Sequence, residues 1–354
     1  MTGVAAEAVA PAEAGVAAYR ALTRRRRLVV AGLGATLLAC LVADLMIGPA
    51  RYGVAEVVGA LASPASAPAA LRVVIWEIRL PVALMAMVTG AALAIAGAQM
   101  QTILDNPLAS PFTLGISAAA SFGAALALVL GVSIVPVAID YLVPANAFVA
   151  AAGAALLIHA LSQRRGVTTE TVVLVFTFNA LLSLLQFVAS EQALGAVVFW
   201  TMGSLTKATW HKLAITSAVL ALCVPAFARR AWALTALRLG DDKARSFGIN
   251  VRRLRLETML LVSLLAAVPV AFVGTIGFIG LVGPHLARML VGEDQRFFMP
   301  ASALAGAALL SAASVVSKAL VPGLIVPISI VTALVGVPFF FSLILSRDPR
   351  WRSW

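Results

Sequence analysis

Uninterrupted apolar runs of about twenty residues recur along nearly the whole chain, and they limit its possible folds more than any other feature. A run of that length matches a helix that crosses the hydrocarbon core of a bilayer. Strands of a membrane barrel would instead alternate apolar and polar residues over about ten positions. Hydrophobic residues make up 62% of the 354 residues and charged residues only 12%. The sequence therefore predicts an all-α polytopic membrane protein and excludes a soluble enzyme.

Ten candidate transmembrane helices follow from these runs. They cover residues 28–47, 81–103, 111–131, 145–163, 171–190, 212–228, 256–274, 276–291, 299–317 and 327–345. The stretch 256–291 must fold back on itself, because a single helix over it would be about 54 Å long, against a hydrocarbon core of about 30 Å. The apolar segment 193–203 is too short to span, so we expect a re-entrant or interfacial helix there with Trp200 at the headgroup level.

The charge of the chain fits a membrane location. Lys and Arg number 26 against 15 Asp and Glu, a formal net charge of +11. If the N-terminus is cytoplasmic and the chain crosses ten times, 20 of these 26 basic residues lie inside and 6 outside. Such asymmetry is typical of inner-membrane proteins, whose cytoplasmic loops collect basic residues. We therefore expect both termini in the cytoplasm, and no nucleic-acid partner.

Three regions follow from this pattern. Residues 1–27 are expected to form a disordered, basic cytoplasmic tail, because the first 19 are rich in Ala and lack a periodic apolar face. Residues 28–346 form a single ten-helix transmembrane domain, and residues 347–354 form a short cytoplasmic tail.

A polar cytoplasmic stretch, residues 237–255, interrupts the apolar pattern. Residues 241–248 are typical of a short helix that begins with acidic residues and ends at glycine. Leu239 and Phe247 are apolar among these charges. A docking surface explains them, although a solvated loop helix remains an alternative.

Several segments, taken in order, resemble one family. They are Arg79-Leu80-Pro81, residues 90–93 and 97–101, Asn106-Pro107-Leu108-Ala109, residues 114–117 and 241–249, Gly277 to Arg288, Pro300-Ala301-Ser302, and Val331 to Phe340. Together they resemble the permease subunits of type II ABC importers, the FecCD/BtuC-like family that moves ferric siderophores, haem or cobalamin. The resemblance runs from about the first span to the C-terminus.

The resemblance implies a function and a set of partners. A permease of this kind pairs with a second copy of itself in the lipid bilayer, two cytoplasmic ATPase subunits drive it, and a periplasmic binding protein delivers the substrate. The sequence has no G-x-x-x-x-G-K-[ST] motif, so we expect ATP and Mg on the ATPase, and no cofactor, metal or catalytic residue on this chain. An iron chelate, either a ferric siderophore or haem, is the expected substrate, with cobalamin as the alternative.

The resemblance also implies candidate site residues. In the coupling loop that seats on the ATPase, Asp241, Asp242 and Arg245 would offer charged rim contacts, Phe247 an apolar anchor, and Gly248 the end of the helix. Basic positions that receive the binding protein are Arg79 and Lys318, which could instead be interfacial anchors. Residues of the cytoplasmic gate and the channel-lining fifth span are Asn106, Leu108, Thr168, Thr169, Phe176 and Asn179.

Two other classes of protein fit less well. A transporter driven by an ion gradient would need ionisable residues at mid-membrane, whereas Asp44, Asp105, Asp140 and Glu170 lie at span ends. An intramembrane enzyme would need converging catalytic groups, but the three histidines are scattered, and neither H-E-x-x-H nor G-x-S-x-G occurs.

Overall fold

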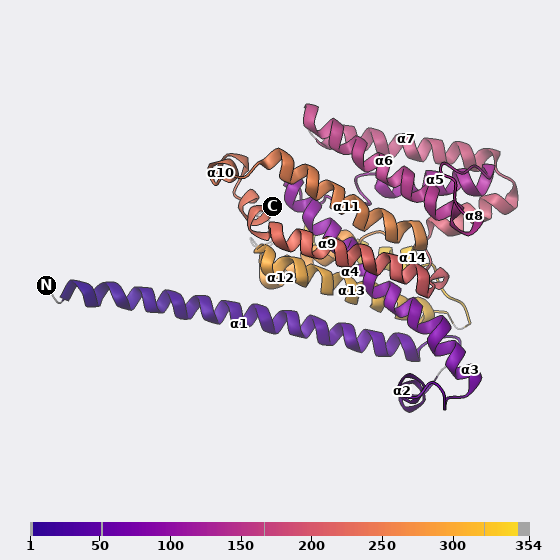
Figure 1. Cartoon of the computed structure of the whole chain (residues 1–354), viewed down its shortest axis with the longest axis horizontal. Helices are drawn as coiled ribbons and strands as arrows, with labels where there is room; N and C mark the ends of the chain where they lie inside the picture. The colour runs from indigo at the N-terminus through magenta and orange to yellow at the C-terminus, as the bar shows by residue number, and fades with distance from the viewer. Residues whose placement is uncertain (1–2, 51, 166, 322, 346–354) are drawn as a thin grey trace.

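The computed structural model describes residues 3–50, 52–165, 167–321 and 323–345, with the backbone alone for 3–15, 159, 161–165, 167–172 and 343–344. Within these ranges the chain forms helices joined by loops, and no strand (Figure 1). The prediction of an all-helical protein is confirmed. The helices run roughly along one direction, so the molecule has two ends, which we call the α10 end and the α2 end after the short helices that lie there (Figure 1).

The helix bounds are as follows. In chain order they are α1 (Gly3–Met46), α2 (Val54–Ala62), α3 (Ala69–Arg72), the π-helical η1 (Val73–Arg79), α4 (Leu80–Leu104), α5 (Ile116–Leu130), η2 (Ile139–Tyr141), α6 (Leu142–Arg165), α7 (Val167–Val188), α8 (Glu191–Thr201), η3 (Leu205–Lys207), α9 (Trp210–Leu237), α10 (Asp241–Ser246), α11 (Val251–Val273), α12 (Ile279–Val291), α13 (Gln295–Ala319) and α14 (Ile328–Leu345).

Every predicted span has a helical counterpart. In the described part of the chain, six helical segments are long and apolar enough to cross a membrane: Val16–Met46, Ala69–Leu104, Ile139–Ile158, Trp210–Leu237, Val251–Val273 and Gln295–Ala319. The other four predicted spans coincide with shorter apolar helices: Ile116–Leu130, Val173–Val188, Ile279–Val291 and Ile328–Ser342. The chain is thus a polytopic membrane protein, while the number of ten crossings stays a prediction.

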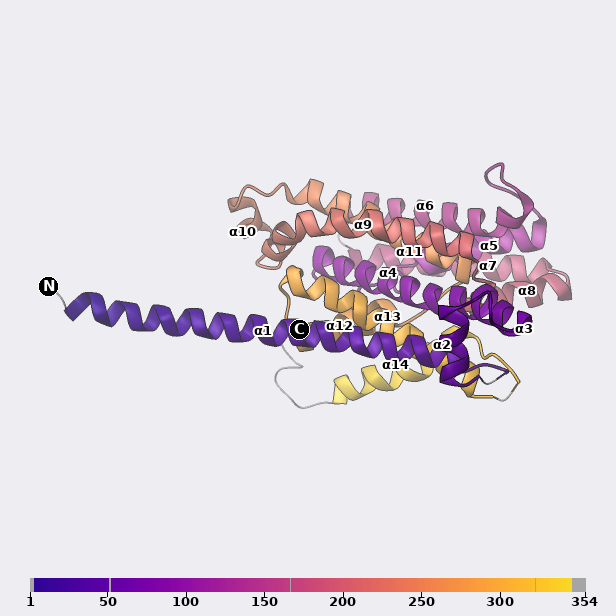
Figure 2. The ribbon, with the colours of Figure 1, turned by 60° about the horizontal axis from the view of Figure 1, so that its bottom comes forward.

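Helix α1 differs from its expected form. It begins at Gly3, so residues expected to be a disordered tail continue the first span as one helix that extends beyond the bundle (Figures 1 and 2). Two physical reasons account for this. Alanine has the highest helix propensity, and a segment that extends an existing helix avoids the cost of nucleation. The boundaries of the tail and the transmembrane domain stay predictions.

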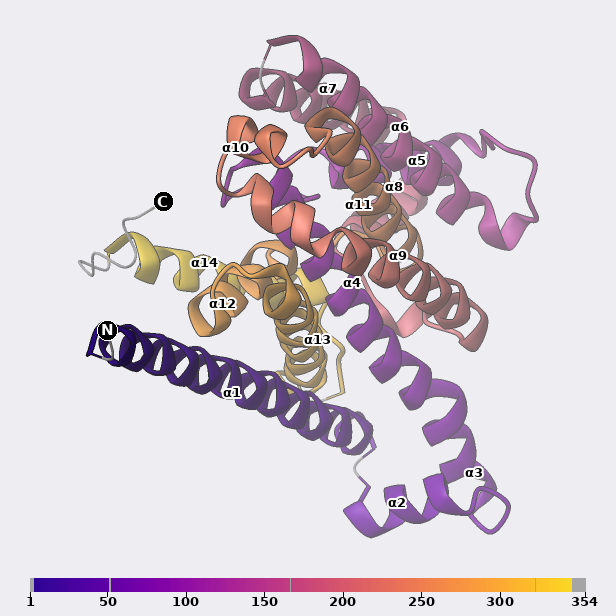
Figure 3. The same cartoon turned by 60° about the vertical axis from the view of Figure 1, so that its left-hand side comes forward.

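Helix α4 lies at the centre and packs against α13, α12, α11 and α9 (Figure 3). Glycines allow its backbone to touch two of these neighbours. A Cβ added to Gly97 would lie 2.6 Å from the carbonyl carbon of Gly280 on α12. A Cβ added to Gly90 would lie 2.9 Å from Cα of Ala307 on α13. Small residues at such positions are the usual means by which transmembrane helices pack closely.

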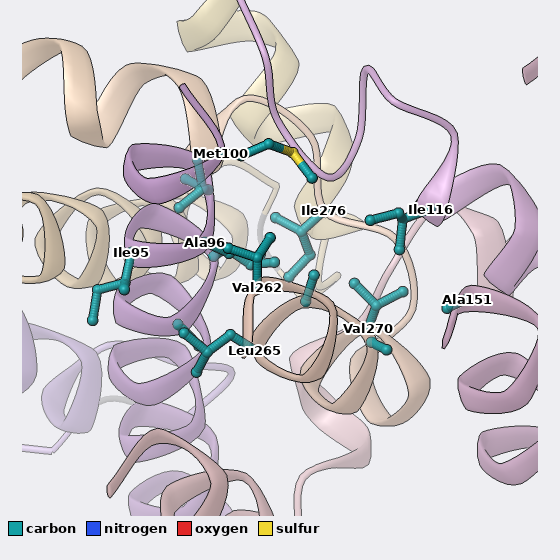
Figure 4. Packing of buried hydrophobic residues seen from close by; sticks show 14 of the residues in the cluster. Ile95, Ala96, Met100, Ile116, Ala151, Val262, Leu265, Val270 and Ile276 are labelled. Carbon is teal, nitrogen blue, oxygen red and sulfur yellow. The ribbon is translucent and has the colours of Figure 1, made fainter. Parts of the chain in front are cut away.

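The main apolar core lies between α4, α5, α6 and α11 (Figure 4). Ile95 and Met100 of α4 are buried with Val262 and Leu265 of α11, and Ile116 of α5 belongs to the same cluster. Helix α11 contacts both α4 and α6, so it connects α4 with the packed pair α5 and α6.

The short helix α8 has 11 residues, which agrees with a segment too short to span. Trp200 is buried in the main core, and its depth in the membrane stays a prediction. The chain then turns at Gly203, whose φ is +67°. A Cβ on Gly274 would lie 2.9 Å from Cα of Gly203, so the end of α8 fits closely against the turn that folds 256–291 back on itself. Tertiary packing of that turn thus draws Trp200 inward.

Candidate functional site

Helix α10 carries the predicted coupling segment and lies between the ends of α9 and α11 (Figures 1 and 3). The prediction of a short helix that begins with acidic residues and ends at glycine is confirmed. Gly240 precedes the helix with φ +99°, and Gly248 follows it with φ +80°. Residues with a Cβ rarely adopt such positive φ angles, whereas glycine adopts them readily. The two glycines therefore define the turns that present α10 at the surface.

Asp241 holds α10 to the bundle. Its carboxylate accepts hydrogen bonds from both terminal nitrogens of Arg255 on α11, at 3.0 and 2.9 Å. Nε of Arg255 also donates to the carbonyl oxygen of Ile103 near the end of α4, at 3.0 Å. The Asp241 side chain is 33% exposed and also lies 3.8 Å from the Arg245 guanidinium, so its rim contact with the ATPase stays a prediction. Its bidentate partner Arg255 comes from the next helix.

The other side of α10 is exposed on the surface of the chain. The Asp242 side chain is 99% exposed and that of Arg245 is 63% exposed, with 3.2 Å between their charged groups. Phe247 is 52% exposed, and its ring centroid lies 6.0 Å from that of Trp232 on α9. Trp232 was missed at the sequence level, although an aromatic residue near the charged end of a span is a usable signal. The two rings and the charged rim form what we call the α10 face.

An ionic network links α9 to the end of α4. Arg238, just after α9, pairs with Glu293 and with Asp105, the latter at 3.0 Å. Glu293 lies between α12 and α13 and also pairs with Arg288 at 3.1 Å. Arg288 in turn donates to Oε1 of the buried Gln101 at 3.0 Å. This network lay outside sequence reasoning, because its members are far apart along the chain.

The loop after α4 contains the predicted gate residues. It starts at Asp105, whose φ of +46° is unusual for a residue other than glycine. Oδ1 of Asn106 then accepts a hydrogen bond from the backbone N–H of Leu108 at 2.9 Å, and Thr113 donates to the Leu108 carbonyl oxygen at 3.0 Å. These bonds hold the backbone and leave the Leu108 side chain 60% exposed. The gate role itself stays a prediction.

Helix α7 presents two of the predicted pathway residues on one face. Phe176 is 69% exposed, and Asn179 follows one turn later and is also exposed. An amide that faced lipid would leave its hydrogen-bonding groups unpaired at considerable cost. This face therefore suits a surface lined by protein or water. The side chains of Thr168 and Thr169 lie outside the described residues.

Arg79 is buried at the α2 end. Its Nη1 donates to the carbonyl oxygens of Leu45 at 2.6 Å and Met46 at 3.0 Å, and its Nη2 donates to that of Ala50. The guanidinium also lies over the ring of Tyr52, 4.9 Å from its centroid. Arg79 therefore satisfies carbonyl groups that the end of α1 leaves without helical partners. It is not available on the surface, and its docking role stays a prediction.

Lys318 has a comparable place on α13. Its Nζ lies 2.9 Å from Oδ1 of Asp44, and Ser314 donates to Oδ2 of the same carboxylate at 3.2 Å. Asp44 is fully buried, and the Lys318 side chain is only 8% exposed. Both predicted docking residues thus bind the end of α1. Exposed basic side chains at this end include Arg72 and Lys207.

The three histidines are apart in space where their side chains are described. His211 lies edge-on to Tyr141, and His285 lies edge-on to Phe339. The side chain of His159 is outside the described residues. Among the described residues, no group of three His, Cys, Asp or Glu side chains could hold a metal ion.

Asp294 caps α13 and gives a pH-dependent contribution to stability. It accepts from the backbone N–H of Arg296 and pairs with that guanidinium at 2.7 Å, which holds the pKa of Asp294 below its ordinary value. A lowered folded pKa stabilises the protein above the unfolded pKa, about 3.9, and the gain is lost as pH falls through the folded value. We expect Asp294→Asn to cost about 0.5 to 1 kcal/mol at pH 7. Thermal unfolding in detergent should show this difference at pH 7, and the difference should shrink as the pH is lowered below about 3.9. A difference that does not change with pH would contradict the ionic explanation.

Comparison with known proteins identifies the family. Residues 36–346 match the model of the FecCD transport family. The chain belongs to the FecCD transport family. Among its FecCD relatives, the ABC transporter permease protein MJ0087 of Methanocaldococcus jannaschii is 37% identical over 344 residues, which cover 94% of this chain and 98% of the relative. The hemin transport system permease protein HmuU of Yersinia pestis is 38% identical over 284 residues, which cover 78% of this chain and 85% of HmuU.

Solved structures agree with this assignment. An inward-facing metal-chelate type ABC transporter aligns with a TM-score of 0.78 at 31% identity, covering 90% of this chain and 99% of that one. Other FecCD relatives are named for the import of molybdate, cobalamin and Fe(3+)-citrate. This FecCD chain is therefore an ABC transporter permease, a transport component and not an enzyme.

Proposed function

We propose that this FecCD permease carries an iron chelate, a ferric siderophore or haem, from a periplasmic binding protein into the cytoplasm by alternating access. Two copies of the chain enclose the pathway in the inner membrane. Two ATPase subunits hold ATP and Mg, and one of them binds the α10 face of each copy. The α10 end is then cytoplasmic, together with both termini. This orientation agrees with the distribution of basic residues.

One observation carries the proposal: a continuous chain of contacts leads from the α10 face to the loop after α4, and it starts at Arg245, which lies 3.8 Å from Asp241. Asp241 binds Arg255, and Arg255 binds the backbone of Ile103, two residues before the loop starts. Arg238 pairs with Asp105 at the loop itself. A displacement of α10 by the ATPase would therefore reach Asn106 and Leu108 through charge-assisted hydrogen bonds, which are short and directional.

The chemistry of α7 supports a large, partly apolar substrate. Phe176 offers an exposed aromatic wall and Asn179 a hydrogen-bonding group on the same face. Such a surface suits a chelate better than a bare ion. The relatives named for hemin and Fe(3+)-citrate support iron, while those named for cobalamin leave that corrinoid as the alternative substrate.

The deciding experiment is uptake into proteoliposomes that contain this chain. Radioiron is supplied as ferric siderophore or as haem on purified binding protein, with and without ATPase and ATP, and cobalamin is tested in parallel. We expect iron uptake only when every component is present. Uptake driven by an ion gradient without the ATPase would contradict the proposal and support a secondary transporter.

The coupling step has its own variant. Phe247→Asp places a charge in the apolar part of the α10 face and should weaken ATPase binding by about thirty-fold, as expected for a residue worth about 2 kcal/mol at an interface. Ser246→Ala, an exposed position of the same helix, is the matched control and should bind as the wild type does. Equal affinities for Phe247→Asp and the control would remove α10 as the ATPase contact.

A further inference from the structure

Helix α1 has two faces with different neighbours. The face toward α13 carries Val30, Leu33 and Leu37, which lie in the apolar clusters shared with the rest of the bundle. Arg26 belongs to this face, because its guanidinium lies 3.6 Å from Asp294 and 5.3 Å from the ring centroid of Phe297. Arg26 is thus the member of the basic run at residues 24–27 that contacts α13 and its capping residue.

A neighbouring face, about a third of a turn around the helix, carries a stripe of exposed arginines, while the exposed Arg25 of the same run lies on another side. Arg20, Arg24 and Arg27 are spaced i, i+4 and i+7, which places them on one side of a helix, and all three are exposed. Leu38 and Val42, 60% and 41% exposed, follow Arg24 by about four and five whole turns. The arginine stripe is therefore the continuation of the face that α1 presents to lipid.

The arginines also lie at the right depth for headgroups. The apolar run begins at Leu28, which is 63% exposed, so Arg27 and Arg24 lie within about 6 Å of its start along the helix axis. None of the three arginines makes an ion pair within the part of the chain that the structure describes. Arg24 and Arg27 thus lie at the level of the phosphates of the adjacent leaflet, and Arg20 lies about 12 Å from the start of the apolar run, on the same side.

We propose that Arg20, Arg24 and Arg27 form a binding surface for the phosphate groups of anionic phospholipids, and we call it the α1 stripe. Phosphatidylglycerol has the required chemistry: a phosphate for the guanidinium groups and acyl chains that lie along Leu38 and Val42. The proposal does not depend on the transport function.

The test measures lipid binding to the purified full-length chain in a neutral detergent. Phosphatidylglycerol is titrated, bound lipid is counted by native mass spectrometry, and phosphatidylcholine is the uncharged reference. Each basic residue near an anionic surface contributes about a five-fold gain in binding, so Arg24→Gln with Arg27→Gln should weaken phosphatidylglycerol binding by about 25-fold. The wild-type preference should also decrease as salt is raised.

Arg26→Gln is the matched control, since it removes the same charge from the adjacent position but on the face toward Asp294. We expect it to change phosphatidylglycerol binding by less than about two-fold, while lowering the melting temperature because Asp294 loses a partner. Equal losses for Arg26→Gln and the double variant would overturn the proposal. It would also fail if the double variant kept its lipid but lost the ATPase subunit, since the stripe would then serve a protein.

Discussion

Replacing Gly97 by alanine is expected to destabilise the permease by about 3 kcal/mol, at the upper end of the usual cost of overpacking. The added Cβ would overlap the carbonyl group of Gly280, and backbone cannot rotate away as a side chain can. Helices α4 and α12 would have to separate, which would also disturb the contact between α4 and α13. Chemical unfolding of the purified variant in detergent, with folded yield from the membrane, measures the loss.

The matched control for Gly97 is Gly153 of α6, which is also inside a helix. Apart from its chain neighbours and the backbone of its own helix, no atom lies within 4 Å of a Cβ added there, and the residue is exposed. Gly153→Ala should therefore be neutral or gain up to about 1 kcal/mol from helix propensity. If Gly97→Ala proved as stable as Gly153→Ala, the close contact between α4 and α12 would be wrong.

Replacing Lys318 by alanine should cost about 3 to 5 kcal/mol, because it leaves the fully buried carboxylate of Asp44 without its cation. The expected loss is one of stability, measured by unfolding in detergent. The comparison variant is Arg72→Ala, which removes an exposed basic side chain at the same end of the bundle and should change stability by less than about 0.5 kcal/mol.

A double variant separates the buried charge from other effects of Lys318. Asp44→Asn with Lys318→Met removes both charges, and most of the lost stability should return, since a buried ion pair replaced by neutral groups is often neutral in cost. A double variant as unstable as Lys318→Ala would contradict this explanation. Normal stability of Lys318→Ala with weakened binding-protein affinity would instead favour the docking role.

Part of the candidate site was predictable from local sequence signals, and part depended on contacts between distant helices. The α10 helix was predicted because its acidic start and its glycine end are local signals that lie within a few residues. The ion pair between Asp241 and Arg255 was not predictable, because Arg255 comes from the next helix. Trp232 and Phe247 likewise meet only when α9 and α10 are placed side by side.

Local patterns in the chain were enough to predict the helices and their membrane character, because the length of an apolar run and its fit to a bilayer are properties of a continuous segment. Motifs in the expected order were likewise enough to predict the family. The contacts of Arg79 and Lys318 emerged only from the packed helices, because both residues bind the end of α1 from distant positions in the chain. The tertiary structure likewise decided which arginine of the basic run faces the bundle. Pairing between distant residues depends on how helices pack, and one segment does not encode its neighbours.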